Sequence, residues 1–101
     1  MKIITTGHVY ELSNFNNPET TQTISFIHKE KNEAGELVTV NDGTTNEEVL
    51  HMMVDRLTFL DEKMESPHNV NAIHFLNEAL NELNLRTADR MNRGVEGTIN
   101  N

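Results

Sequence analysis

The stretch "NEEVLHMMVDRLTFLDEKMESPHNVNAIHFLNEALNEL", residues 46–83, decides the fold because its apolar residues recur at helical intervals of three and four. The first apolar stripe consists of Leu50, Met53, Leu57, Leu60 and Met64. The second stripe consists of Ile73, Leu76, Leu80 and Leu83. Because the connection between the stripes is short, the pattern predicts two helices packed antiparallel as a hairpin with coiled-coil-like contacts.

The ends of both helices carry recognisable signals. Thr45, with a glutamate three residues later, has the form of a capping box, so the first helix is expected to begin near Asn46. Ser66 and Pro67 suit the N-cap and first position of the second helix. Gly94 is a natural stop for that helix.

The residues before the hairpin carry strand signals. The runs "KIITTGHVYEL" and "TTQTISFIHKE", together with the shorter "ELVTV", are rich in β-branched and aromatic residues. They predict a small antiparallel sheet of two or three strands over residues 1–41, followed by the helical hairpin over 42–94 and a flexible C-terminal tail over 95–101. The sequence therefore predicts a single α+β domain.

Several apolar residues lie beside the helical stripes, so the hairpin has more apolar surface than one partner helix covers. They are Val49, Val54, Phe59, Val70 and Met91. Either the N-terminal sheet covers them in a monomer, or a second copy of the protein does, and we favour a homo-oligomer. For Phe59 on its own, core packing is the expectation.

Composition excludes several classes of protein. The chain has 101 residues, no cysteine and a formal net charge of -8, which argues against disulfides, thiolate metal sites and general binding to duplex nucleic acid. No stretch reaches the roughly 20 apolar residues of a membrane span, and the N-terminus lacks a signal-peptide pattern. A cytoplasmic protein is expected.

Three of the four arginines nevertheless lie close together near the end of the second helix. Arg86, Arg90 and Arg93 are spaced i, i+4 and i+7, so they share one helical face, and two glycines follow them. They either complement the helix dipole and nearby acids, or form a phosphate or diphosphate site, because guanidinium groups match phosphate oxygens bidentately.

The sequence shows few signs of a catalytic site or a metal site. His74 and Glu78 lie four residues apart, but no third ligand has convincing spacing. The sequence holds no phosphate-binding loop motif and no nucleophile motif, and the carboxylates look like a solvated surface. A protein that is not an enzyme, without metal or cofactor, is expected.

The segments "DGTTNEEVL", "DRLTFLDEKM" and especially "LRTADRMNRGVEGT" resemble the Thoeris anti-defence type 1 sponges of phages, over roughly residues 41 to 98. These share a helical-hairpin domain with anti-CBASS cyclic-nucleotide sponges. The resemblance implies a protein that captures glycocyclic ADP-ribose, the signal made by bacterial TIR-domain proteins, without degrading it. It also implies ligand held between protomers, and dimers that can assemble into hexamers, in the host cytoplasm.

The resemblance also assigns roles to residues. It implies an adenine contact by Phe59, a polar contact by Asn69, and phosphate binding by Arg86 and Arg90. Where the family commonly has "FPCREN" between the helices, this chain has "MESPHN", with the loss of an arginine. That departure puts a second site for cyclic oligonucleotides in doubt.

Three functions therefore compete at this point. A sponge for glycocyclic ADP-ribose, or for the cyclic di- or trinucleotides of CBASS, predicts tight binding without turnover. A small phage nucleic-acid-binding or regulatory module would use the same arginines on a nucleic-acid backbone, which the net charge disfavours. An enzyme would consume the nucleotide, which the absence of a nucleophile or metal cluster disfavours.

Overall fold

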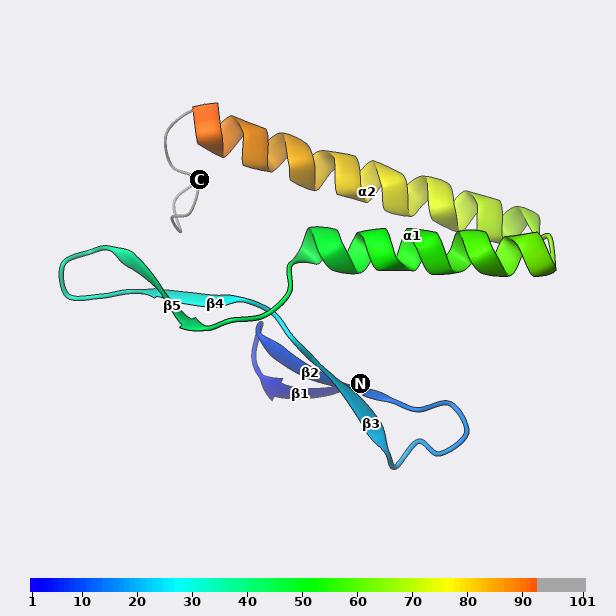
Figure 1. The fold of residues 1–101 in the computed structure, drawn as a ribbon, viewed down its shortest axis with the longest axis horizontal. Helices are drawn as coiled ribbons and strands as arrows, with labels where there is room; N and C mark the ends of the chain where they lie inside the picture. The colour runs from blue at the N-terminus through cyan, green and yellow to red at the C-terminus, as the bar shows by residue number, and fades with distance from the viewer. Residues whose placement is uncertain (93–101) are drawn as a thin grey trace. The chain divides into compact units, whose positions relative to one another are not determined.

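The computed structural model describes residues 1–92. It contains five strands followed by two helices, which confirms the α+β class (Figure 1). The chain divides into two compact units, one formed by Met1–Thr45 and one that begins at Asn46. The first unit holds every strand of the described residues, and the second holds both helices.

The first unit contains two small antiparallel sheets. A three-stranded sheet has the order β1-β2-β3, and β4 and β5 form a separate hairpin. The strands are β1 (Lys2–Thr5), β2 (Val9–Ser13), β3 (Thr21–Ser25), β4 (His28–Lys31) and β5 (Leu37–Asn41). The prediction of one sheet with two or three strands was therefore wrong.

Chain reversals within the predicted runs explain the difference. Gly7 has a φ of 78°, which only glycine adopts readily, and its turn divides the first run into β1 and β2. The second run is divided at Phe26, which pairs in parallel with Thr44 instead of continuing the strand. Gly43 permits this approach, because a Cβ atom there would lie 2.5 Å from the carbonyl oxygen of Ser25.

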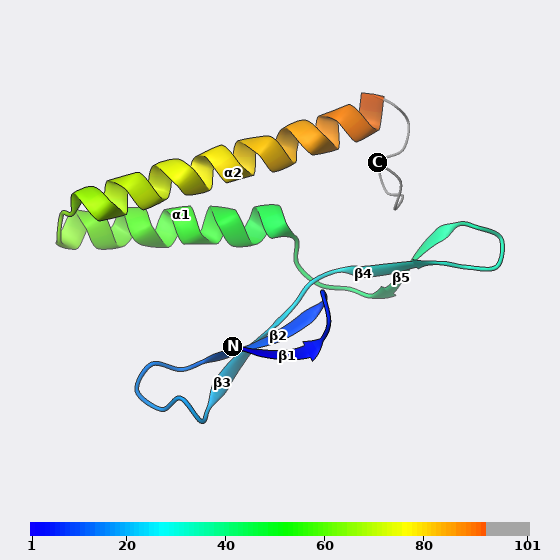
Figure 2. The ribbon, with the colours of Figure 1, turned by 180° about the vertical axis from the view of Figure 1, so that it is seen from behind.

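The second unit consists of α1 (Asn46–Lys63) and α2 (Pro67–Asn92), and both begin where the capping signals predict. The N–H of His68 donates to Oγ of Ser66 at 3.2 Å, so Ser66 caps α2. The helices lie side by side and antiparallel, and α2 continues beyond the N-terminal end of α1 (Figures 1 and 2). Neither described helix has an apolar run long enough to cross a membrane. Gly94 and the predicted tail lie outside the described residues.

The seam between the helices matches the predicted stripe on α2 better than on α1. Leu80 is 7% exposed and is the one buried hydrophobic residue among residues 1–92. The other predicted stripe residues of α2 are half-buried, as are Leu50, Met53 and Leu57 of α1. Leu60 and Met64 were predicted to join that stripe, but they are 38% and 79% exposed. Asp61 is half-buried in their place.

Much apolar surface stays exposed on the helical hairpin of a single chain. The large exposed hydrophobic residues there are Met52, Phe59, Leu60, Met64, Val70, Phe75, Leu85 and Met91. Val49 and Val54, predicted to lie beside the stripe, are half-buried. Apolar surface of this extent is typical of an interaction face. It supports the expectation of a homo-oligomer, which stays a prediction.

We expect the purified protein to be at least a dimer at micromolar concentration, because a second copy would remove the exposed apolar side chains from water. Size-exclusion chromatography with light scattering measures this mass directly. A sharp peak at the monomer mass of 11.5 kDa would contradict the expectation.

Candidate functional site

The predicted site residues lie at two ends of the helical hairpin. Phe59 is on the penultimate turn of α1, and Asn69 is the third residue of α2, so both belong to the end where the helices connect. We call this end the hairpin tip, defined by Phe59, Asp61, Lys63, Ser66 and Asn69. Arg86 and Arg90 lie near the other end of α2, where Arg86 contacts Glu47 in the first turn of α1. Arg93 lies outside the described residues.

The hairpin tip is organised by the carboxylate of Asp61. Its Oδ1 atom accepts a hydrogen bond from the backbone N–H of Ser66 at 2.9 Å and another from Nδ2 of Asn69 at 3.3 Å. These two bonds tie the start of α2 to the end of α1. Asn69 therefore has a local role in the tip in addition to the ligand contact that the family resemblance implies.

Phe59 presents its ring to solvent from the hairpin tip. Its side chain is 53% exposed, so it does not pack in the seam of the hairpin. The ammonium of Lys63 lies 5.3 Å from the ring centroid, within cation–π range. An exposed aromatic ring next to a cation can stack on a planar base while the cation attracts an anionic ligand.

The second cluster, which we call the arginine end, consists of Glu47, Arg86 and Arg90. Arg86 is exposed, and its Nη2 atom lies 3.8 Å from Oε1 of Glu47 in the first turn of α1. Arg90 is half-buried, and its Nε atom is buried without a hydrogen-bond acceptor among residues 1–92. A buried donor without a partner is costly, so it favours an acceptor from outside residues 1–92, such as a ligand.

Electrostatics also favour an anion at the arginine end. Arg86 and Arg90 are one helical turn apart, about 6 Å along the axis, and can converge on one group. The N-terminus of α1 lies nearby, and helix N-termini carry a partial positive charge. Two guanidinium groups with a free donor are suited to hold a phosphate or diphosphate.

The two ends of the hairpin are far apart within one chain. Asn69 and Arg86 lie on the same straight helix, about 26 Å apart at 1.5 Å per residue. The arginines and the Phe59–Asn69 pair therefore cannot contact one compact ligand from a single chain. The structure places Phe59 and Asn69 at one end of the hairpin, and Arg86 and Arg90 near the other end.

Sequence reasoning missed two side chains that organise these clusters. Neither Glu47 nor Asp61 was predicted to contact a residue of the candidate site. The antiparallel register could have indicated Glu47, because Glu47 and Arg86 are about equally far from the connection between the helices. No spacing pattern indicates Asp61, since its hydrogen bonds are specific to the connection.

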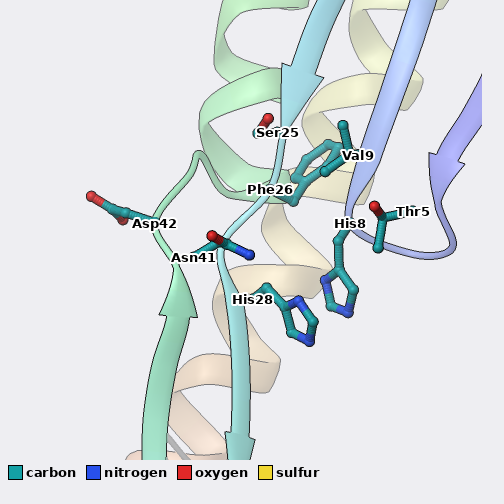
Figure 3. A pocket seen from close by; sticks show the side chains of 8 residues that line it. All are labelled: Thr5, His8, Val9, Ser25, Phe26, His28, Asn41 and Asp42. Atoms are coloured by element: carbon teal, nitrogen blue, oxygen red, sulfur yellow. The ribbon is translucent and has the colours of Figure 1, made fainter.

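The first unit, which contains the strands, has a pocket of about 270 Å³ (Figure 3). The rings of His8 and His28 stack there, with centroids 3.7 Å apart, and Asp42 points away from them. The pocket is lined by Thr5, His8, Val9, Ser25, Phe26, His28, Asn41 and Asp42. None of these lining residues is a lysine or arginine, so the pocket lacks the permanent cations of a phosphate site. Residues 1–92 also bring together no group of three potential metal ligands.

Comparison with known proteins gives one informative relative. The sequence is 41% identical to a curated protein named Thoeris anti-defense 1 from Bacillus phage SBSphiJ7. The alignment is 80 positions long and covers 67% of this chain. The match covers 56% of that protein, so the chain spans little more than half the length of the relative it matches. No family model matches the chain.

Proposed function

The chain belongs to the Thoeris anti-defence 1 family, and from this premise we propose that it opposes Thoeris defence by sequestering glycocyclic ADP-ribose. In this proposal the protein binds the signal and does not degrade it. The signal carries an adenine on a ring that consists of two riboses and a diphosphate. A binding protein therefore needs a surface for the base and cations for the diphosphate.

The observation that carries the proposal is the arginine end. Arg86 and Arg90 offer two guanidinium groups one turn apart, and Nε of Arg90 has no acceptor among the described residues. A diphosphate supplies several acceptor oxygens at this spacing, and charge-assisted hydrogen bonds are about twice as strong as neutral ones. Arg93, seven residues after Arg86 in the sequence, is proposed as a third cation of this site.

The hairpin tip supplies the second requirement. The half-exposed ring of Phe59 can stack on adenine, and Asn69 can contact the base or ribose with the amide oxygen that its bond to Asp61 leaves available. Stacking on an aromatic side chain contributes about 1 to 3 kcal/mol per base in single-stranded nucleic-acid complexes. The roles of Phe59 and Asn69 follow those that the family resemblance implies.

One compact ring cannot reach both clusters of a single chain, which are about 26 Å apart. We therefore propose that two copies form the site, with the tip of one hairpin beside the arginine end of its partner. A two-fold axis makes such a contact reciprocal, so a dimer would hold two equivalent sites. The exposed apolar side chains of the hairpin support this assembly.

The decisive experiment asks whether the bound signal survives. Protein mixed with glycocyclic ADP-ribose should deplete it from solution, and heating to unfold the protein should return the same molecule with unchanged mass and chromatographic retention. The returned molecule should still activate a Thoeris effector. A linear or hydrolysed ADP-ribose product that increases with incubation time would show an enzyme instead.

Phe59→Ala is expected to weaken binding of glycocyclic ADP-ribose by roughly 1 to 3 kcal/mol, because base stacking is lost. Its melting temperature should stay near that of the wild type, since the ring is 53% exposed. Calorimetric titration and thermal unfolding measure the two effects. Phe75→Ala is a matched control, because Phe75 is 68% exposed on α2 and has no proposed ligand contact. A large drop in melting temperature with unchanged affinity would assign Phe59 to packing.

A further inference from the structure

Glu47 is a carboxylate that contacts Arg86, one of the proposed phosphate-binding arginines. Its Oε1 atom lies 3.8 Å from Nη2 of Arg86, and the two side chains are 26% and 47% exposed. Glu47 comes from the first turn of α1, and Arg86 from the second-last full turn of α2, so the contact joins the two helices at the arginine end. A phosphate oxygen and a carboxylate oxygen cannot occupy the same position on one guanidinium group.

We infer that Glu47 competes with the anionic ligand for Arg86 and sets a threshold for its binding. The inference rests on the proposed function of the arginine end as a diphosphate site. In the protein without ligand, Glu47 partly neutralises Arg86. When a diphosphate binds, its oxygens replace the carboxylate and Glu47 turns away from Arg86.

The geometry makes this exchange feasible. At 3.8 Å the contact is long for a charged hydrogen bond, and both side chains are partly exposed, so the ion pair is weak and readily broken. After release, Glu47 stays in the first turn of α1, where the helix dipole favours a negative charge. The released carboxylate therefore keeps a favourable environment.

Competition of this kind raises the concentration at which any anion occupies Arg86. An incoming group must interact with the guanidinium more strongly than the resident carboxylate does. A diphosphate carries more charge and more acceptor oxygens than a carboxylate metabolite, and it can reach both Arg86 and Arg90. Glu47 would therefore reduce the occupation of the site by abundant weak anions at the cost of some affinity for the signal.

Replacement of the carboxylate by an amide tests the inference. Glu47→Gln should bind inorganic diphosphate about two- to fivefold more tightly than the wild type, the range set by a surface ion pair of up to about 1 kcal/mol. Isothermal titration calorimetry of the full chain measures this. Asp55→Asn removes the same charge in the middle of α1, outside both clusters, and should leave the affinity unchanged. The gain should also vanish when Arg86→Ala is combined with Glu47→Gln.

An unchanged or weaker affinity of Glu47→Gln for diphosphate would overturn the inference, and weaker binding would show that Glu47 positions Arg86. A parallel titration with glycocyclic ADP-ribose separates this result from the proposed function. If Glu47→Gln gains affinity for diphosphate while neither protein binds glycocyclic ADP-ribose, the inference holds and the sponge proposal fails. If both proteins bind the signal but the diphosphate affinity does not rise, the reverse is true.

Discussion

Removing both Arg86 and Arg90 is expected to weaken the binding of glycocyclic ADP-ribose about a hundredfold or more. Each guanidinium group should contribute about 1.5 to 3 kcal/mol through charge-assisted hydrogen bonds to the diphosphate. Because each 1.4 kcal/mol corresponds to a factor of ten, either single alanine variant should lose about tenfold or more in affinity, and the double variant about a hundredfold or more. Calorimetric titration of the signal into each variant measures these losses.

The structure provides a matched control for this experiment. Arg56 lies in the middle of α1, outside both clusters, and Arg56→Ala removes the same charge. It should bind the signal as the wild type does. Light scattering should show the same assembly for all variants, since the exposed apolar side chains stay in place. Wild-type affinity in both Arg86→Ala and Arg90→Ala would show that the arginine end does not hold the ligand.

The helices could be predicted from the sequence because their signals are local. The capping residues Thr45 and Ser66, and the first position taken by Pro67, act within one turn, so the beginnings of α1 and α2 agree with prediction. The spacing of apolar residues likewise depends on the helix itself. Leu76, Leu80 and Leu83 therefore lie on the seam as expected.

The second half of the α1 stripe was wrong because a strict repeat of 3.5 residues drifts against a helix of 3.6 residues per turn. Over the length of α1 this drift moves Leu60 to the edge of the seam and brings Asp61 toward it, whereas Met64 lies beyond Lys63, the last residue of α1. The strand count failed for a different reason. The residues around Gly7 and Phe26 all favour strands, so the sequence gives no sign of an interruption. In the structure the chain turns at Gly7, and Phe26 pairs with the distant Thr44 instead of continuing its strand.

The candidate site could be predicted only in part. Helical periodicity aligned Arg86 with Arg90 without any tertiary information. The exposure of Phe59 could not be deduced from its spacing, since residues beside a stripe face either solvent or another element. The wide separation of Phe59 from the arginines requires the antiparallel arrangement of the hairpin, which also implies that a shared ligand needs a second chain.

The proposal that two chains share each ligand predicts complementation between defective variants. Phe59→Ala damages the hairpin tip, and the Arg86→Ala/Arg90→Ala double variant damages the arginine end. In a mixed dimer one site would combine both damaged parts, and the other would combine both intact parts. The two proteins, unfolded together and refolded at equal concentrations, should therefore recover about a quarter of the wild-type sites, since random pairing makes half of the dimers mixed.

A second mixture distinguishes true complementation from a general benefit of mixing. Phe59→Ala and Asn69→Ala both damage the tip, so no dimer formed from them contains an intact tip, and their mixture should bind no better than its components. Native mass spectrometry counts chains and bound signal in the same spectrum, which identifies the mixed dimers directly. If the Phe59 and arginine variants recover no sites although mixed dimers form, each site lies within one chain. The distance between Phe59 and Arg86 along the hairpin is much longer than one nucleotide. That result would therefore also show that one of the two clusters does not contact the ligand.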